Sequence, residues 1–190
     1  MIEIYDNAIS DSLQDRLLAN MQSSNFPWYM TQDTLGTTKK IEKEEIKEYL
    51  QFEHRFYVYD IDKKQTFSNS DTTLIDELIN EIMTILKWDK CEVLRTKANL
   101  QTQFTHNRKN YYNTPHIDMD KECNQLTCLY YVNNNDGCTF FFDNKLNITK
   151  KIESKKGRFV IFEGNILHAG QNPVKSKKRI VLNINFRNNE

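Results

Sequence analysis

Three residues, His116, Asp118 and His168, constrain this chain more than any other feature of its sequence. The first two lie in the segment HIDMD, and residues i and i+2 of a β-strand lie on the same face, so both side chains can turn toward one metal ion. Two imidazoles and one carboxylate make the facial triad that holds Fe(II) and leaves coordination positions open. Because His168 lies much further along the chain, we expect a barrel in which a late strand passes beside an early one.

A second constraint is the alternating run that follows Arg179. One face of this predicted strand carries only apolar side chains, which are Ile180, Leu182, Ile184 and Phe186. The opposite face carries Arg179, Val181, Asn183 and Asn185. Arginine and asparagine are rarely buried without partners or a ligand. Since the planar guanidinium suits a carboxylate better than an ammonium group does, the pattern predicts that Arg179, and not Lys178 on the other face, binds a carboxylate ligand.

The order of these motifs resembles that of a known family. After H-x-D come LTCLYYVN at 126–133, DGCTFFFD, KGRFVIFEG, LHAG and a basic residue that opens the last strand. This order resembles the 2-oxoglutarate- and Fe(II)-dependent dioxygenases, and most of all the prolyl 4-hydroxylase branch with its compact phage and bacterial members. The resemblance covers residues 91–186. It implies a mainly β protein with flanking helices, folded as a double-stranded β-helix or cupin-like jelly roll.

The resemblance also implies a site and a reaction. Fe(II) is bound by His116, Asp118 and His168, and these residues and Arg179 form the catalytic set. The distal carboxylate of 2-oxoglutarate is held by Arg179 and Tyr131, and Asn183, on the same strand face as Arg179, is placed in the same cosubstrate site. The expected reaction consumes O2, converts 2-oxoglutarate to succinate and CO2, and hydroxylates a C–H bond of the substrate, with ascorbate as a stimulant.

The substrate is less constrained than the cosubstrate. The resemblance of TCLYYVN and LHAG favours a prolyl residue of a peptide or protein, and the alternative is the same chemistry on a small molecule or nucleotide. Two loops, 26–36 and 104–115, are expected near the pocket, with Trp28 either there or in the core. Their aromatic and basic side chains are Trp28, Tyr29, Arg108, Tyr111 and Tyr112.

Two alternatives belong to other functional classes. A zinc hydrolase would use the same three ligands and a bound water, but Arg179 and Tyr131 would then have no role. The other alternative is a cupin-like binding module without catalysis. It would bury Arg179 without a ligand, and the free-energy cost of such a buried charge argues against it. Two further histidines, His54 and His106, are expected at surface or hydrogen-bonded positions, because neither lies in a pattern that supports metal binding.

The predicted organisation is a single domain over residues 1–190, with a helical support region at 1–90 and the catalytic core at 91–186. Helices are expected from Ser10 and from residue 70 or 71 to Trp88, packed on the larger sheet, with a strand at 53–61 between them. In the core, NNNDG at 133–137 is expected to close a hairpin between 126–132 and 138–143, and a second turn lies at 142–147.

Composition indicates the setting of the protein. Aromatic residues make up 12% and apolar residues 38% of 190, enough for a buried core. The four cysteines show no paired spacing, and no signal peptide or apolar span is found, so we expect a soluble cytoplasmic monomer or homodimer. Residues 91–190 carry 16 basic and 9 acidic side chains. This excess suits an anionic cosubstrate and is too small to predict a nucleic-acid partner.

Overall fold

The computed structural model describes residues 1–31, 51–60, 62–68, 70–104, 111–118 and 125–188. Within these ranges the chain forms two helices and eleven strands. Their bounds are β1 (Ile2–Tyr5), α1 (Asp11–Gln22), β2 (Tyr29–Thr31), β3 (Gln51–Asp60), β4 (Gln65–Phe67), α2 (Thr73–Leu86), β5 (Cys91–Thr102), β6 (Gln125–Tyr131), β7 (Cys138–Phe142), β8 (Ile148–Glu153), β9 (Phe159–Glu163), β10 (His168–Gly170) and β11 (Lys178–Asn188).

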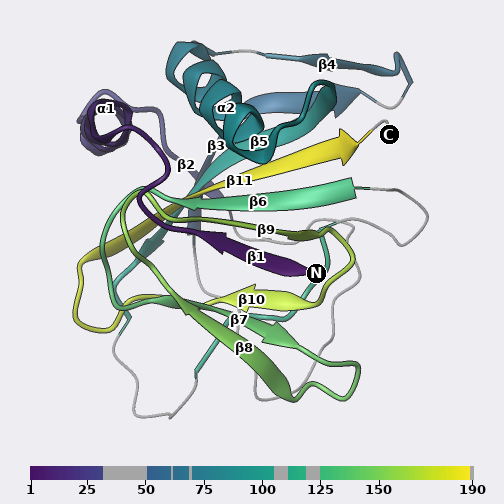
Figure 1. Ribbon diagram of the computed structural model, residues 1–190. Coiled ribbons are helices and arrows are strands. Elements are labelled where there is room, and N and C mark those ends of the chain that lie inside the picture. Colours follow the sequence, from purple (N-terminus) through teal and green to yellow (C-terminus); the bar gives the residue numbers. More distant parts are fainter. Residues whose placement is uncertain (32–50, 61, 69, 105–110, 119–124, 189–190) are drawn as a thin grey trace.

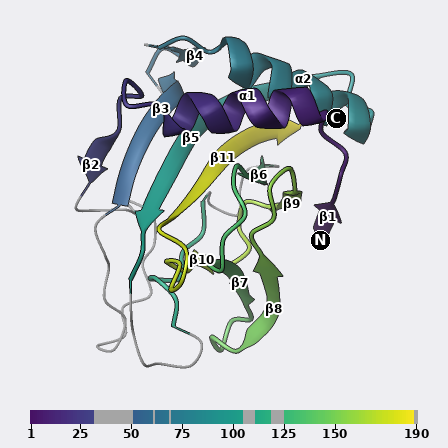
Figure 2. The ribbon, with the colours of Figure 1, turned by 90° about the vertical axis from the view of Figure 1, so that its left-hand side faces the viewer.

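The strands form two sheets that lie in separate layers (Figure 1). The larger sheet has the order β1-β9-β6-β11-β5-β3-β2, with β4 paired to β3, and the smaller has the order β10-β7-β8. All of these pairings are antiparallel. In the view turned by 90°, α1 and α2 cover one face of the larger sheet and β7, β8 and β10 lie beyond the other (Figure 2).

The helices pack on the larger sheet through the main apolar core. The core face of α2 presents Ile75, Leu78, Ile79 and Ile82, all buried. They meet the apolar side of β11, where Ile180, Leu182, Ile184 and Phe186 are at most 1% exposed. Both predictions, the amphipathic helices on the sheet and the core face of the last strand, are confirmed. Helix α1 begins after Ser10, whose hydroxyl donates to Glu81 on α2 rather than to its own helix.

The space between the two sheets holds a second apolar cluster. It joins Leu129, Tyr131, Val160, Phe162 and Val181 of the larger sheet to Phe141 and Ile152 of the smaller. Packing two antiparallel sheets through their inward faces is the architecture of a jelly roll, so the predicted fold class is confirmed. No helix in the described part of the chain is long and apolar enough to cross a membrane.

One predicted pairing is wrong. The segment 133–137 does turn the chain, but β6 and β7 do not form a hairpin around it, because β6 pairs with β9 and β11 and β7 pairs with β8 and β10. The turn carries the chain from one sheet to the other. The second predicted turn does close a hairpin, between β7 and β8. The predicted hairpin pairs two strands because they are adjacent in sequence, whereas in a jelly roll consecutive strands can lie in different sheets.

Candidate functional site

The three predicted metal ligands converge at one end of the space between the sheets. His168 opens β10, and its backbone exchanges two hydrogen bonds of 2.9 Å with His116, which makes an isolated antiparallel bridge. Asp118 follows, with its amide bonded to Gly164 O at 3.0 Å. One ligand atom from each side chain lies within 4.8 Å of the others. The segment 116–118 is therefore extended, but it makes only the single bridge of His116 to His168 and is not part of a longer strand. The side chains of His116 and Asp118 still face the same site, as their i, i+2 spacing predicts.

Both imidazoles are oriented by backbone carbonyls. His116 Nδ1 lies 3.1 Å from Thr114 O, and His168 Nδ1 lies 3.0 Å from Ile166 O. Because a carbonyl oxygen only accepts, each Nδ1 donates a proton to it, and Nε2 is the ring nitrogen left to bind a metal. Burial, reinforced by His168, lowers the pKa of His116 to about 3, so its imidazole is neutral at physiological pH. An imidazole held at Nδ1 by a carbonyl presents its Nε2 in a fixed orientation, which suits a metal ligand.

The carboxylate of Asp118 is surrounded by donors. Thr127 donates at 3.0 Å, Arg95 at 3.1 Å, and the amide of Asn183 donates to both oxygens at 3.1 and 3.3 Å. Burial opposes ionisation, but His168, Arg95 and Asn183 together hold the pKa of Asp118 well below its usual range. The group is an anion in a fixed orientation. Asn183, which the sequence places in the cosubstrate site, donates to the carboxylate of Asp118, and its own Oδ1 has no partner among the described residues.

Arg179 lies on the same cavity and is 5% exposed. Its Nη1 donates to Gln101 Oε1 and its Nη2 to Thr139 Oγ1, both at 2.8 Å, and its Nε lies 3.2 Å from Ser154 Oγ. All three acceptors are neutral, and within the described residues no carboxylate pairs with this cation. Three of the five guanidinium N–H groups are used, which leaves one on each terminal nitrogen for a bidentate anion.

A glycine makes room for the stem of Arg179. A Cβ added at Gly137 would lie 2.5 Å from Gln171 O and 2.8 Å from Arg179 Cδ. The first of these atoms belongs to the backbone and cannot move out of the way easily. The short segment that precedes β11 is held by Asp136, whose carboxylate accepts the amides of Val174, Lys175 and Ser176 at 2.8 to 3.0 Å. The turn 133–137 therefore positions Arg179.

Tyr131 stands behind the cavity rather than in its wall. It is fully buried, and its hydroxyl donates to Thr139 Oγ1 at 2.8 Å. Since Thr139 Oγ1 accepts from both Tyr131 and Arg179, its own proton is free to donate into the cavity that it lines. Sequence reasoning missed Thr139, although it is the one polar residue in the strand CTFFF and shares the inward face with Phe141.

The remaining wall of the cavity comes mainly from β5. Its inward residues are polar without exception, namely Arg95, Lys97, Asn99 and Gln101. They alternate with Thr96, Ala98 and Leu100, of which Ala98 and Leu100 pack in the helix-side core. This alternation is visible in the sequence CEVLRTKANLQT, and the polar half of it was not recognised as part of the site.

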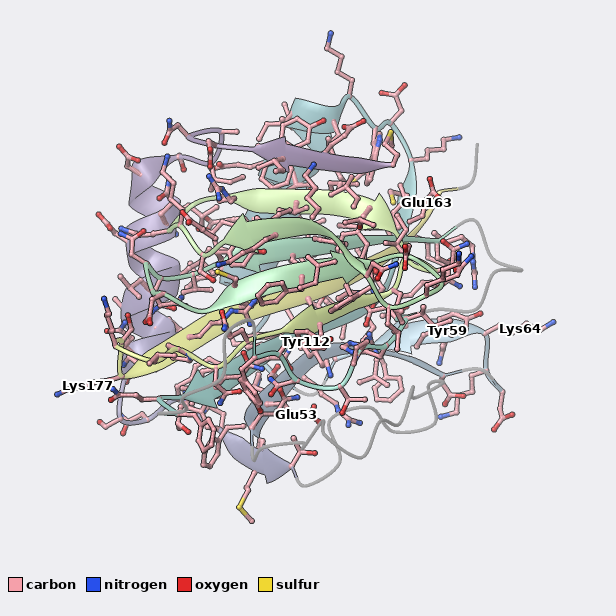
Figure 3. The ribbon with its side chains drawn as sticks, turned by 90° about the horizontal axis from the view of Figure 1, so that it is seen from below. Glu53, Tyr59, Lys64, Tyr112, Glu163 and Lys177 are labelled. Atoms are coloured by element: carbon pink, nitrogen blue, oxygen red, sulfur yellow. The ribbon has the colours of Figure 1, made fainter. Side chains whose placement is uncertain are left out.

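The aromatic residues expected near the pocket lie elsewhere. Trp28 packs against the helix-side core and donates to Met21 O at 3.2 Å. Tyr112 covers the outer face of the smaller sheet, with its ring 4.8 Å from that of Phe142, and Figure 3 shows it on this lower face. Tyr29 is 63% exposed on β2, and Tyr111 is buried beside Phe104. Arg108 and His106 lie outside the described residues.

Of the two histidines set aside from the metal, His54 can be placed. It is 6% exposed, and its Nδ1 lies 3.0 Å from Pro27 O. His54 does not line the cavity that contains His116 and His168. The predicted hydrogen-bonded role of His54 is confirmed.

Comparison with known proteins agrees with this geometry. Residues 102–187 match the family model of the 2OG-Fe(II) oxygenase superfamily. A search of curated proteins finds no match. Among solved structures, the chain is similar to a viral collagen prolyl hydroxylase from Paramecium bursaria Chlorella virus-1, with 17% identity, a TM-score of 0.55 and coverage of 98% of this chain and 95% of that one.

Two further structures share the fold. A prolyl-4-hydroxylase from Pseudomonas putida is 13% identical, with a TM-score of 0.58 and coverage of 98% and 92% of the two chains. A prolyl hydroxylase from Trichoplax adhaerens, solved with a hypoxia-inducible factor peptide, is 13% identical, with a TM-score of 0.61 and coverage of 98% and 83%. Residues 102–187 are therefore similar to the 2OG-Fe(II) oxygenase superfamily, whose members use Fe(II), 2-oxoglutarate and O2, and the fold of the chain is shared with solved prolyl hydroxylases.

Proposed function

We propose that this chain is an Fe(II)- and 2-oxoglutarate-dependent oxygenase and that His116, Asp118 and His168 bind its Fe(II). The observation that carries the proposal is the meeting of three ligand atoms within 4.8 Å, two of them imidazole nitrogens held from behind by carbonyls. The donor set of two imidazoles and one carboxylate fits Fe(II) and leaves positions for a bidentate cosubstrate. The bound Fe(II) would supply the activation of O2 by which 2-oxoglutarate is converted to succinate and CO2 and a substrate C–H bond to C–OH.

The other polar residues of the cavity bind and orient. Arg179 directs its two unused N–H groups at the distal carboxylate of 2-oxoglutarate, and Thr139 adds its hydroxyl proton. Tyr131 supports the same carboxylate through Thr139, to which it donates. Asn183 and Arg95 keep Asp118 ionised and fix its orientation. A single cavity is lined by the ligand set and by a cation without a carboxylate partner in the described chain.

The ligand assignment is tested with single substitutions. We expect His168→Ala to lose Fe(II) binding, measured anaerobically by the visible charge-transfer band that appears when Fe(II) and 2-oxoglutarate are both bound. The matched control is His54→Gln, because His54 is an equally buried histidine outside the cavity. Full turnover by His168→Ala would contradict the assignment. Tight zinc binding without the band in the wild type would favour the zinc hydrolase instead.

For the substrate, we propose a prolyl residue of a peptide or protein. Support comes from the likeness to the viral, Pseudomonas and Trichoplax structures, each of which is named a prolyl hydroxylase. A small molecule is the second candidate, and it is favoured by the polar wall of β5 together with the absence of aromatic side chains from the described lining of the cavity. Mass spectrometry after incubation with proline-containing peptides, free proline and nucleosides separates the two. Addition of one oxygen atom to small molecules alone would remove the prolyl proposal.

We also propose that the chain is one domain and acts in the cytoplasm. Three cysteines, Cys91, Cys128 and Cys138, are unpaired in the described chain, as expected in a reducing compartment. Size-exclusion chromatography with light scattering would distinguish the two expected states, a monomer and a homodimer. Cell fractionation would test the location.

A further inference from the structure

Lys97 is a nearly buried cation without an adequate partner. It lies on the cavity face of β5, between Arg55 of β3 and Asn183 of β11 in the strand register. Its side chain is 13% exposed, and within the described residues its ammonium has only Glu53 Oε2, at 3.6 Å, and no hydrogen bond. Glu53 is already held by Arg55, with Nε at 2.8 Å and Nη2 at 2.7 Å from Oε1.

The other cations of the cavity have assigned partners. Arg95 is paired with Asp118 at 3.1 Å, and Arg179 faces the proposed site of the cosubstrate carboxylate. Because Fe(II) and the 2-oxoglutarate dianion cancel, the site keeps the positive charges of Arg179 and Lys97 when the metal and cosubstrate are bound. Of these two cations, only Lys97 has no ligand assigned to it. Burial lowers the pKa of Lys97, and the anions Glu53 and Asp118 offset this only in part.

Lys97 is close enough to the metal site to act on the substrate but is separate from the ligands. Its register partner Asn183 hydrogen-bonds to Asp118, so one strand spacing separates the lysine from the residue that orients the carboxylate ligand. Along β5 the cavity wall continues through Asn99, whose Oδ1 is buried and unpaired in the described chain, and Gln51 of β3 lines the same cavity.

We propose that Lys97 binds a carboxylate of the prime substrate and thereby selects substrates that carry one close to the hydroxylated carbon. The inference rests on the proposed function, since it takes the cavity as the catalytic site. The carboxylate has two possible sources, an aspartate or glutamate beside a prolyl residue, or the α-carboxylate of a free amino acid. Either would supply the anion that Glu53 does not supply.

The test measures binding without turnover. Protein with Fe(II) and 2-oxoglutarate is kept anaerobic and titrated with fluorescent peptides in which Asp or Asn flanks a single proline on either side. The small-molecule arm compares L-proline with L-prolinamide. A charge-assisted hydrogen bond predicts about tenfold tighter binding of the acid member of a pair, or about 1.4 kcal/mol. A peptide-only preference identifies a side-chain carboxylate, and a proline-only preference identifies the free amino acid.

Variants assign the preference to the residue. We expect Lys97→Met to bind both members of each pair equally, and Lys97→Arg to restore most of the preference. The control is Lys177→Met, because Lys177 is an exposed lysine that points away from the molecule (Figure 3). The charge-transfer band of Fe(II) with 2-oxoglutarate is recorded on each sample, so loss of the band in the wild type would reject the proposed function itself.

Three results would overturn the inference while leaving the oxygenase intact. The first is a wild type that binds no acid probe more tightly than its amide. The second is a preference that survives in Lys97→Met. The third is a loss of 2-oxoglutarate affinity in Lys97→Met, which would assign the lysine to the cosubstrate.

Discussion

Replacement of Arg179 by methionine should separate cosubstrate binding from stability. The guanidinium has two unused N–H groups aimed into the cavity, and two charge-assisted hydrogen bonds are worth about 3 kcal/mol at the low end of the usual range. At about 1.4 kcal/mol per factor of ten, the affinity for 2-oxoglutarate should fall about a hundredfold. The control is Lys178→Met, because Lys178 is adjacent and half-buried but does not line the cavity.

The stability of the protein without cosubstrate should behave differently. Arg179 is buried without a carboxylate partner among the described residues, so its removal relieves a desolvation cost, whereas Gln101, Thr139 and Ser154 each lose one donor. These effects oppose each other, and we expect the free energy of unfolding to stay within about 1 kcal/mol of wild type.

Denaturant unfolding with and without 2-oxoglutarate, in the presence of anaerobic Fe(II), measures both quantities. At a concentration one hundred times the wild-type dissociation constant, the ligand should stabilise the wild type by about 2.7 kcal/mol and the variant by about 0.4 kcal/mol. Equal stabilisation of the two proteins would refute the role of Arg179. A large loss of stability in the ligand-free variant would show that the arginine is mainly structural.

Three other predictions follow from the surroundings of Arg179. Tyr131→Phe should lower the affinity for 2-oxoglutarate by tenfold or less, because the neutral hydrogen bond that Tyr131 donates to Thr139 contributes about 1 kcal/mol. Isothermal titration of Tyr131→Phe and Arg179→Met measures both affinities, and a larger loss of affinity in Tyr131→Phe would contradict this prediction. Gly137→Ala should also reduce affinity, since the new Cβ would meet Arg179 Cδ at 2.8 Å, and normal binding with normal stability would show that the turn adapts. Asp136 should make the free energy of unfolding decrease in acid. Burial opposes the ionisation of its carboxyl group, but hydrogen bonds from three backbone amides lower its pKa to about 2. Its contribution to stability is therefore present above the unfolded pKa near 4 and is lost as the pH falls toward 2. Because the group is exposed, we expect a loss of no more than about 1 kcal/mol, and Asp136→Asn unfolded in parallel across this pH range should lack that part of the pH dependence.

The sequence alone determined what depends on short-range periodicity and on residue chemistry. Alternation with period two assigned the faces of β11, and helical spacing assigned the apolar face of α2, because these geometries follow from backbone dihedrals over a few residues. The proposed metal ligands His116, Asp118 and His168 could be named from the sequence, as could Arg179, because polar and charged side chains are rarely buried without a partner or a ligand.

Tertiary structure decided everything that depends on which distant strands meet. Whether 133–137 closes a hairpin or carries the chain to the other sheet depends on pairings with β9, β10 and β11, which the local sequence does not encode. The pairing of β5 with β11 sets Gln101 opposite Arg179, and packing between distant segments puts Thr139 beside Arg179 and Trp28 in the core. Lys97 looks like an ordinary lysine in a polar stretch, and it becomes a buried cation only because β3 and β11 flank β5 on both sides. Burial and charge balance are sums over neighbours, and neighbours far apart in sequence exist only in the folded chain.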